Sequence, residues 1–193
     1  MAKGTNTKET IKRQALNLFV AQGVDGTGVR EIAKTSGITE GAIYRHFKGK
    51  DELVWLLFSE NYSAYAEKLE ALQDREHGVA NKLAAMIRGF CMFYDQDEIL
   101  FRFLLLVQHG QLDKIDDKSP SPVRVVAGVI QQGLDQEEFK APPFQDAMEA
   151  TAWVFGIVLE TATFKIYNRL TGSMYARADG LVKACNGALG LKP

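Results

Sequence analysis

The sequence predicts an all-α protein, and three observations support this fold class. Apolar residues recur at helical spacing through most of the 193 residues. Glycine, proline and short polar clusters interrupt these stripes at the points where helices would end. No stretch shows the sustained alternation of apolar and polar residues that is typical of a half-buried strand. We expect about nine helices, with three in an N-terminal head (residues 1–50) and six in a body (residues 51–193).

Two short helices joined by a tight turn are predicted between residues 28 and 47. An apolar stripe at i, i+3 and i+4 begins at Val29 and predicts one face of the first helix. Gly37 interrupts the stripe and permits a turn with positive φ. Thr39 is a favourable N-cap for the second helix, because its hydroxyl can accept from a backbone N–H of the first turn. This arrangement is a helix-turn-helix.

The second of these helices has a polar outer face. Its polar or amphipathic side chains are those of Thr39, Glu40, Tyr44, Arg45 and His46. The small residues Gly41 and Ala42 beside them would allow close approach to another surface. Such a helix suits the DNA major groove, where polar side chains contact base edges and phosphates. The alternative is an ordinary helix with a solvated surface.

A set of residues between about positions 8 and 54 matches a known pattern. The matching residues are Phe19, Gly23, the run 27–33, the run 37–47 and the run 50–53. The pattern resembles the N-terminal domain of the TetR (tetracycline-repressor) family. Membership would imply a homodimeric transcription regulator, usually a repressor that a small molecule releases from DNA. Gly28 departs from the pattern, since members often carry Ser or Thr there, so any hydroxyl for a phosphate must come from Thr27.

The resemblance also implies which residues contact double-stranded DNA. Those expected to face bases are Thr39, Glu40, Gly41 and Arg45, with Arg30 on the preceding helix. Those expected to bind phosphates are Thr27, Tyr44, His46 and Lys50. An arginine can donate to O6 and N7 of guanine, and a glutamate can accept from N4 of cytosine.

The charge distribution favours DNA as the partner of the head. Residues 1–50 hold nine Lys/Arg and four Asp/Glu, a balance of +5. Residues 51–193 hold fourteen and twenty, a balance of −6, so the net charge of −1 conceals a basic head on an acidic body. Phosphate contacts supply much of the affinity of DNA-binding proteins, and they require such a basic surface.

The two cysteines and the apolar segments indicate the compartment. Cys91 and Cys185 lie far apart in the chain and lack metal-type spacing, so we expect a reducing compartment and no disulfide. The N-terminus has no apolar core of a signal peptide, and the longest apolar stretch is too short to cross a membrane. We therefore expect a soluble, cytoplasmic protein with no membrane partner.

The body is predicted to form the dimer. Its helices are expected at 51–72, 79–94, 99–107, 122–134, 144–170 and from 174 to about 189. The segment 144–170 is apolar nearly all round, so it would be buried on more than one side. The resemblance places the homodimer interface on the last two helices, residues 144–189, where two hairpins would form a four-helix bundle. We expect Leu181 at the centre of this bundle and Ala178, Ala184 and Ala188 at close helix approaches.

Aromatic residues of the body predict a pocket for a small-molecule inducer. The candidates for its wall are Tyr62, Tyr65, Phe90, Phe93 and Trp153, and the candidates for polar contacts are Arg102, His109 and Glu160. This composition favours a largely apolar, aromatic or acyl molecule. The alternatives are that most of the aromatic rings only pack the core and that the side chains of Arg102 and Glu160 reach the surface.

No group of residues indicates catalysis, a metal or a cofactor. The three histidines share no spacing, and Cys91 with His109 lacks a third catalytic group. We therefore expect no enzymatic activity. The sequence favours a DNA-binding transcription regulator, a repressor that a largely apolar small molecule releases from a palindromic operator. The alternative is a small-molecule-binding helical module in which DNA contact is vestigial.

Overall fold

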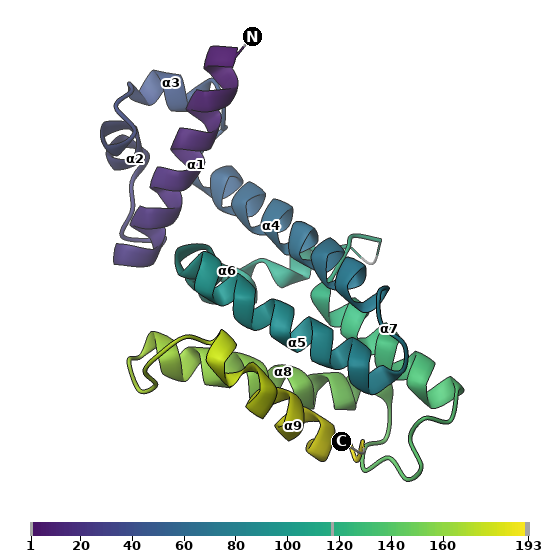
Figure 1. The fold of residues 1–193 in the computed structure, drawn as a ribbon. Helices are drawn as coiled ribbons and strands as arrows, with labels where there is room; N and C mark the ends of the chain where they lie inside the picture. Colours follow the sequence, from purple (N-terminus) through teal and green to yellow (C-terminus); the bar gives the residue numbers. More distant parts are fainter. Residues whose placement is uncertain (1, 117, 192–193) are drawn as a thin grey trace. The chain divides into compact units, whose positions relative to one another are not determined.

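The computed structural model describes residues 2–116 and 118–191, with the side chains of residues 2–6 left undescribed (Figure 1). This part of the chain contains nine α-helices, three short 3-10 helices and no strand, which confirms the predicted all-α class. The chain divides into two compact units. The first comprises Met1–Asn61 with Ile99–Lys118, and the second comprises Tyr62–Glu98 with Ser119–Pro193.

The first unit contains the predicted helix-turn-helix. Its helices are α1 (Ala2–Gln22), α2 (Val29–Thr35), α3 (Glu40–Tyr44), the beginning of α4 (Lys50–Gln73), α6 (Glu98–Val107) and the 3-10 helices η1 (Gln108–Gly110) and η2 (Leu112–Lys114). α1 begins six residues before the predicted start at Lys8. Elongating an existing helix adds one hydrogen bond per residue, and no proline interrupts this segment.

An aromatic pair joins α1 to α6 within the first unit. Phe19 and Phe103 are both fully buried, and their rings stack with centroids 5.8 Å apart and planes at 22°. The other buried apolar side chains of α1 are Ile11, Ala15 and Leu16. The core under the helix-turn-helix therefore includes a residue from much later in the chain.

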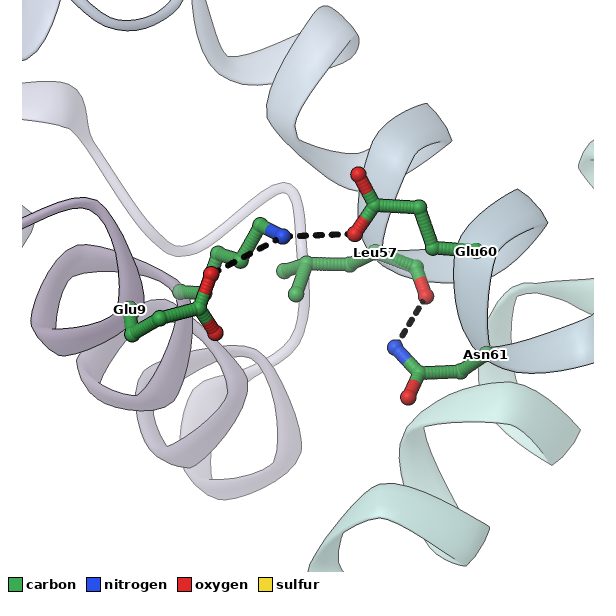
Figure 2. Close-up of polar contacts among 5 residues, drawn as sticks. Glu9, Leu57, Glu60 and Asn61 are labelled. Carbon is green, nitrogen blue, oxygen red and sulfur yellow. Dashed lines mark hydrogen bonds and ion pairs between the residues drawn. The ribbon is translucent and has the colours of Figure 1, made fainter. Parts of the chain in front are cut away.

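Lys12 joins α1 to α4 in the same unit. Its Nζ lies 2.5 Å from Oε2 of Glu60 and 3.3 Å from Oε1 of Glu9, and Figure 2 shows these carboxylates beside the amine together with the Asn61–Leu57 hydrogen bond. Burial lowers the pKa of Lys12, but Glu60 and then Glu9 offset this, and the net pKa is raised. Lys12 therefore fixes α1 on α4.

The second unit is a layered bundle. It contains the rest of α4, α5 (Val79–Gln96), α7 (Pro122–Asp135), α8 (Ala147–Ile166), the 3-10 helix η3 (Tyr175–Arg177) and α9 (Ala178–Ala188). α5 packs against α7 and α9, and α8 packs against the same two helices (Figure 1). α4 approaches α5 closely, because a Cβ added at Gly89 would overlap the side chain of Leu72.

α8 is shorter than the predicted helix 144–170. It begins at Ala147 because Asp146 is its N-cap, with Oδ1 accepting from the N–H of Glu149 at 2.8 Å. It ends at Ile166, and Asn168 then adopts φ of 56° while the N–H of Arg169 donates to the carbonyl of Phe164 at 2.9 Å. These two caps set the ends of α8. The predicted ends depended instead on prolines before the helix and a glycine after it.

The compact units do not follow the predicted boundary at residue 50. α4 begins in the first unit and ends in the second, and α6 belongs to the first unit although it follows α5 in the chain. The functional division into head and body therefore stays a prediction.

Among the described residues, the structure contains no helix that combines the length and apolarity needed to span a membrane.

Candidate functional site

The turn between α2 and α3 is fixed by backbone hydrogen bonds. Gly37 has φ of 70°, and the N–H of Ile38 donates to the carbonyl of Ala33 at 3.0 Å. A residue with a side chain would be strained at this φ. Oγ1 of Thr39 accepts from the N–H of Ala42 at 3.3 Å, as predicted for an N-cap. These contacts set the position of α3 with respect to α2.

α3 has one buried and one exposed face. Ala42 and Ile43 are buried, and Phe47 closes the core just beyond the helix. The predicted DNA-contacting residues of this segment that are exposed are Thr39, Glu40, Gly41, Tyr44 and Arg45, and His46 is half-buried. Tyr44 is 54% exposed, which is unusual for a large aromatic side chain. The residues predicted to contact DNA on this helix thus share an accessible surface.

Arg30 extends this surface onto α2. Its side chain is exposed, and its Nε lies 3.9 Å from Oε1 of Glu40 at the start of α3. Glu31, the next residue, accepts instead from Nε2 of Gln22 on α1 at 2.6 Å. The carboxylate of Glu31 therefore faces away from the surface that Arg30 and Glu40 share.

Thr27 does not fit its predicted role as a phosphate ligand. It is 1% exposed, and its hydroxyl donates to the carbonyl of Gly23 at 2.8 Å while accepting from Nε2 of Gln22 at 3.3 Å. The hydroxyl therefore closes the loop between α1 and α2. Because Gly28 has no side chain to replace it, the N-terminus of α2 presents no hydroxyl to a phosphate.

Two lysines lie at the beginning of α4. Lys50 donates from Nζ to the carbonyl of Val24 at 2.8 Å, which leaves two N–H donors of the ammonium group for other partners. Sequence reasoning missed Lys48, which is exposed and lines a shallow hollow with residues 49–52. The Lys48-Gly49-Lys50 break before the helix was the available signal. The N–H of Lys48 donates to Glu52, and this contact fixes the break on the first turn of α4.

The structure brings some of the predicted ligand-binding aromatic residues together. Tyr65 on α4 stacks on Phe93 of α5, with centroids 4.8 Å apart and planes at 25°. Burial, and then the nearby Cys91, raise the pKa of Tyr65. Phe90 is buried, and the hydroxyl of Tyr62 lies 3.3 Å from that of Ser121. An aromatic wall on α4 and α5 therefore exists within the second unit.

Trp153 packs in a different aromatic cluster. Its ring meets Phe144 edge-on at 6.1 Å, and Phe144 meets Phe139 edge-on at 5.2 Å. This geometry is that of ordinary core packing. Arg102 is half-buried and His109 is exposed, and both belong to the first unit. A pocket that combines them with the aromatic wall stays a prediction.

Glu160 and Leu181 differ from their predicted surroundings. Glu160 is exposed on α8, so its side chain reaches the surface, as the alternative interpretation held. Leu181 is only 7% exposed and Ala178 is buried, so both pack inside the single chain. The sequence predicted Leu181 at the centre of the dimer bundle, whereas the structure buries it within the chain together with Val182 and Cys185. Ala184 is exposed.

The exposed residues of α8 and α9 are mostly apolar or small. The exposed residues on α8 recur every four positions and are Met148, Ala152, Gly156, Glu160 and Phe164. Those on α9 are the small residues Gly180, Ala184 and Gly187 and the charged residues Asp179 and Lys183. Among the residues that the structure describes, no three His, Cys, Asp or Glu side chains are grouped to hold a metal.

Comparisons with known proteins agree with this architecture. The family model described as "Bacterial regulatory proteins, tetR family" matches residues 11–55. A fatty acid metabolism regulator protein of Bacillus subtilis is 25% identical over 173 residues, or 88% of each chain. A bacterial regulatory protein in the tetR family from Rhodococcus RHA1 has a similar fold, with TM-score 0.80, 18% identity and full coverage of both chains. The Bacillus subtilis transcriptional regulator FadR, solved with stearoyl-CoA, has TM-score 0.75 and 20% identity over 94% of this chain and 98% of its own.

Proposed function

Because the chain belongs to the TetR family of bacterial regulatory proteins, we propose that it represses transcription from a palindromic operator until a small molecule releases it. The protein is a DNA-binding transcription regulator rather than an enzyme, and it acts in the cytoplasm, where its operator would be found. The observation that carries this proposal is the exposed polar face of α3, positioned by the Gly37 turn and the Thr39 cap.

Base contacts come from Arg45, Thr39, Gly41 and Arg30, with Glu40 beside Arg30 on the same surface, and phosphate contacts come from Tyr44, His46, Lys48 and Lys50. All of these residues have exposed or half-buried side chains or backbone in the first unit. The test is titration of the purified chain against duplexes selected from a random-sequence pool. Arg45→Ala should weaken binding by about 1–3 kcal/mol and relax the preference at one base pair. Arg75→Ala, which removes an exposed charge from the α4–α5 connection, is the matched control.

Selection of duplexes also tests the proposal as a whole. A consensus with two related half-sites in inverted orientation supports a regulator that binds as a symmetric dimer. Recovery of unrelated sequences after repeated selection would contradict the DNA-binding proposal. In that case the small-molecule-binding module with vestigial DNA contact would be the better description.

The dimer forms through the exposed side of the α8–α9 hairpin. Its small residues allow close helix approach, and its apolar residues gain burial when a second hairpin covers them. Ala184→Glu places a charge on this face without entering the core of the chain, whereas Leu181→Glu would disrupt that core. Sedimentation should show that Ala184→Glu is monomeric with unchanged helix content, and that Lys183→Glu on the neighbouring exposed position has a smaller effect.

The inducer is a molecule with a long acyl chain, and an acyl-CoA thioester is the leading candidate. Support comes from the similarity to the fatty acid metabolism regulator of Bacillus subtilis and to FadR, which was solved with stearoyl-CoA. The aromatic wall formed by Tyr65, Phe90 and Phe93 offers an apolar surface of the required kind. Release follows only if the ligand binds the DNA-free conformation more tightly than the DNA-bound one.

Binding is measured with stearoyl-CoA, with free CoA and with stearate. The comparison separates the contribution of the acyl chain from that of the CoA group. Stearoyl-CoA should raise the melting temperature and weaken operator binding by about 5- to 150-fold, the usual range of allosteric coupling. Phe93→Ala should reduce the effect, whereas Tyr167→Ala, which removes an exposed ring just beyond α8, should preserve ligand affinity. If stearoyl-CoA binds without altering operator affinity, it is not the inducer.

A further inference from the structure

We infer that Arg30 and Glu40 form one base-reading unit, in which Glu40 positions the guanidinium of Arg30 for a guanine in the operator. This inference rests on the proposed DNA-binding function and names two further properties of the same surface. The first property is the base that Arg30 reads. The second property is the discrimination that Glu40 adds by keeping Arg30 away from backbone phosphates.

The two side chains meet although they come from different helices. Arg30 is the second residue of α2 and Glu40 is the first residue of α3, and Nε of the arginine lies 3.9 Å from Oε1 of the glutamate. The turn at Gly37 and the cap at Thr39 fix the backbone between them. The approach of these two charges is therefore determined by the same backbone geometry that orients α3.

The contact involves the nitrogen of Arg30 that guanine needs least. A guanidinium carries five N–H donors, one on Nε and four on the two terminal nitrogens. A carboxylate beside Nε leaves the two terminal nitrogens available as a fork. Such a fork matches the paired acceptors N7 and O6 of guanine in the major groove. Glu40 thus restricts Arg30 to the orientation that suits a base edge.

Stability alone gives little reason for this pair. The side chain of Arg30 is 92% exposed and that of Glu40 is 49% exposed, and exposed ion pairs contribute little to folding. A carboxylate on a surface that also carries Lys34 and Arg45 opposes attraction to phosphates. Its presence therefore opposes phosphate contact, and its favourable effect falls on base selectivity. An Arg30 held by Glu40 exchanges a phosphate contact, which carries no sequence information, for a base contact.

The experiment uses the full chain and duplexes that the wild-type protein selects from a random-sequence pool. Binding is measured by fluorescence anisotropy for the consensus, for single base-pair replacements in one half-site and for a scrambled duplex. The proteins are wild type, Glu40→Ala, Glu40→Gln, Arg30→Ala and the Arg30→Ala, Glu40→Ala double variant. All replaced side chains are exposed, so melting temperatures should agree and variants that fail to fold are not expected.

Glu40→Ala should reduce the preference for one G·C pair per half-site by about fivefold or more. The same variant should bind the scrambled duplex more tightly and show a steeper salt dependence, because Arg30 becomes free to bind phosphate. Glu40→Gln should lose the preference as well, because Nε of Arg30 and Oε1 of Glu40 lie 3.9 Å apart, beyond hydrogen-bond distance, and only the charge of the carboxylate attracts the guanidinium. Lys34→Ala, the matched control on α2, should reduce the salt dependence and leave the preference unchanged.

A modified base gives a measurement that a purely structural role of Glu40 would not change. Replacing the preferred guanine with 7-deazaguanine removes its N7 acceptor. The replacement should weaken wild-type binding about fivefold, and it should change the binding of Arg30→Ala and of Glu40→Ala by less than twofold. Sensitivity to 7-deazaguanine in Arg30→Ala that equals that of the wild type would overturn the inference.

The double variant decides whether the two residues act together. If the pair is one unit, Glu40→Ala should have no further effect on base preference once Arg30 is absent. Additive losses of preference would overturn the inference while leaving the proposed DNA-binding function in place. A wild-type chain that selects no consensus removes the proposed function itself, and this outcome is visible before any variant is compared.

Discussion

The α2–turn–α3 segment and the α8–α9 hairpin differ in where their apolar surface goes. α3 has five residues, and its two buried side chains, Ala42 and Ile43, face the core of the first unit. α8 has twenty residues and is apolar on nearly every side, so the core of the second unit covers only part of its surface. The short helix leaves a polar face open, whereas the long hairpin leaves apolar and small residues open.

This difference indicates two kinds of partner. A polar surface fixed by local caps on a small core can contact base edges without losing its own structure. Burial of an exposed apolar surface is favourable when a second apolar surface covers it, and the proposed dimer would supply that surface from a second copy of the chain. The small core of the first unit and the extended core of the second should also respond differently to substitution.

Phe19→Ala should produce the largest loss of stability among the substitutions considered for this comparison. Phe19 is fully buried against Phe103, and deletion of such a ring costs about 3–5 kcal/mol. Urea unfolding measures the change, and DNA binding should be lost at lower urea concentrations than in the wild type. Tyr167→Ala, where the ring is 68% exposed, is the aromatic control. Equal effects of the two variants would contradict the small-core description of the first unit.

The two buried cysteines give the second unit a stability that depends on pH. Burial raises the pKa of Cys185 to about 11, from an ordinary value of 9.0. The pKa of Cys91 is also raised to about 11, by burial and then by Asp95 and Cys185. The fold favours the protonated thiols, so their contribution is complete below about pH 9 and is lost as the pH rises through about 11.

Cys185→Ala isolates this pH effect from the titration of lysines and tyrosines. Between pH 9 and pH 11, the free energy of unfolding of the wild type should fall by about 1–2 kcal/mol more than that of the variant. Chemical denaturation at several pH values measures the difference. Parallel pH profiles would show that the thiol of Cys185 titrates in the folded chain much as it does in the unfolded chain.

Removal of the N-cap of α3 or of α8 should lower the free energy of unfolding by similar amounts, but the two changes should affect DNA binding differently. Thr39→Ala and Asp146→Ala each remove a side-chain acceptor from a helix N-terminus, at a cost of about 1 kcal/mol. Only Thr39→Ala should weaken operator binding, because α3 carries the proposed base contacts. Thr39→Ser should restore both properties. A loss of operator binding in Asp146→Ala at temperatures where it is fully folded would contradict this separation.

Two turns with a left-handed residue complete the comparison, and Glu137→Gly in the second of them has the smallest expected effect. Gly37 between α2 and α3 has φ of 70°, and Glu137 after α7 has φ of 55°. Glu137→Gly relieves strain, and after the entropic cost of glycine it should stabilise the chain by about 0.5 kcal/mol. Gly37→Ala should destabilise it by about 1–2 kcal/mol. Thermal unfolding measures both changes, and a destabilised Glu137→Gly variant would show that the side chain of Glu137 makes a compensating contact.

Local sequence signals were sufficient for most of the helix-turn-helix. Gly37 and Thr39 act on backbone groups within about four residues, so the turn and the cap could be predicted from their neighbours. Helical periodicity likewise predicted a helix at 79–94, where the structure has α5. The exposed placement of Arg45 and Tyr44 followed from the same periodicity. These predictions needed no knowledge of which distant segments meet.

The sequence by itself therefore determined the all-α class, the order of the nine helices in the described part of the chain and the polar face of α3. Only the tertiary structure decided that Thr27 is buried, that Leu181 packs within the chain and that Glu160 is exposed. It also decided that Phe103 completes the core around Phe19. The physical reason is that periodicity defines the faces of a helix, whereas burial depends on which other elements cover each face. That covering is set by contacts between segments far apart in the chain.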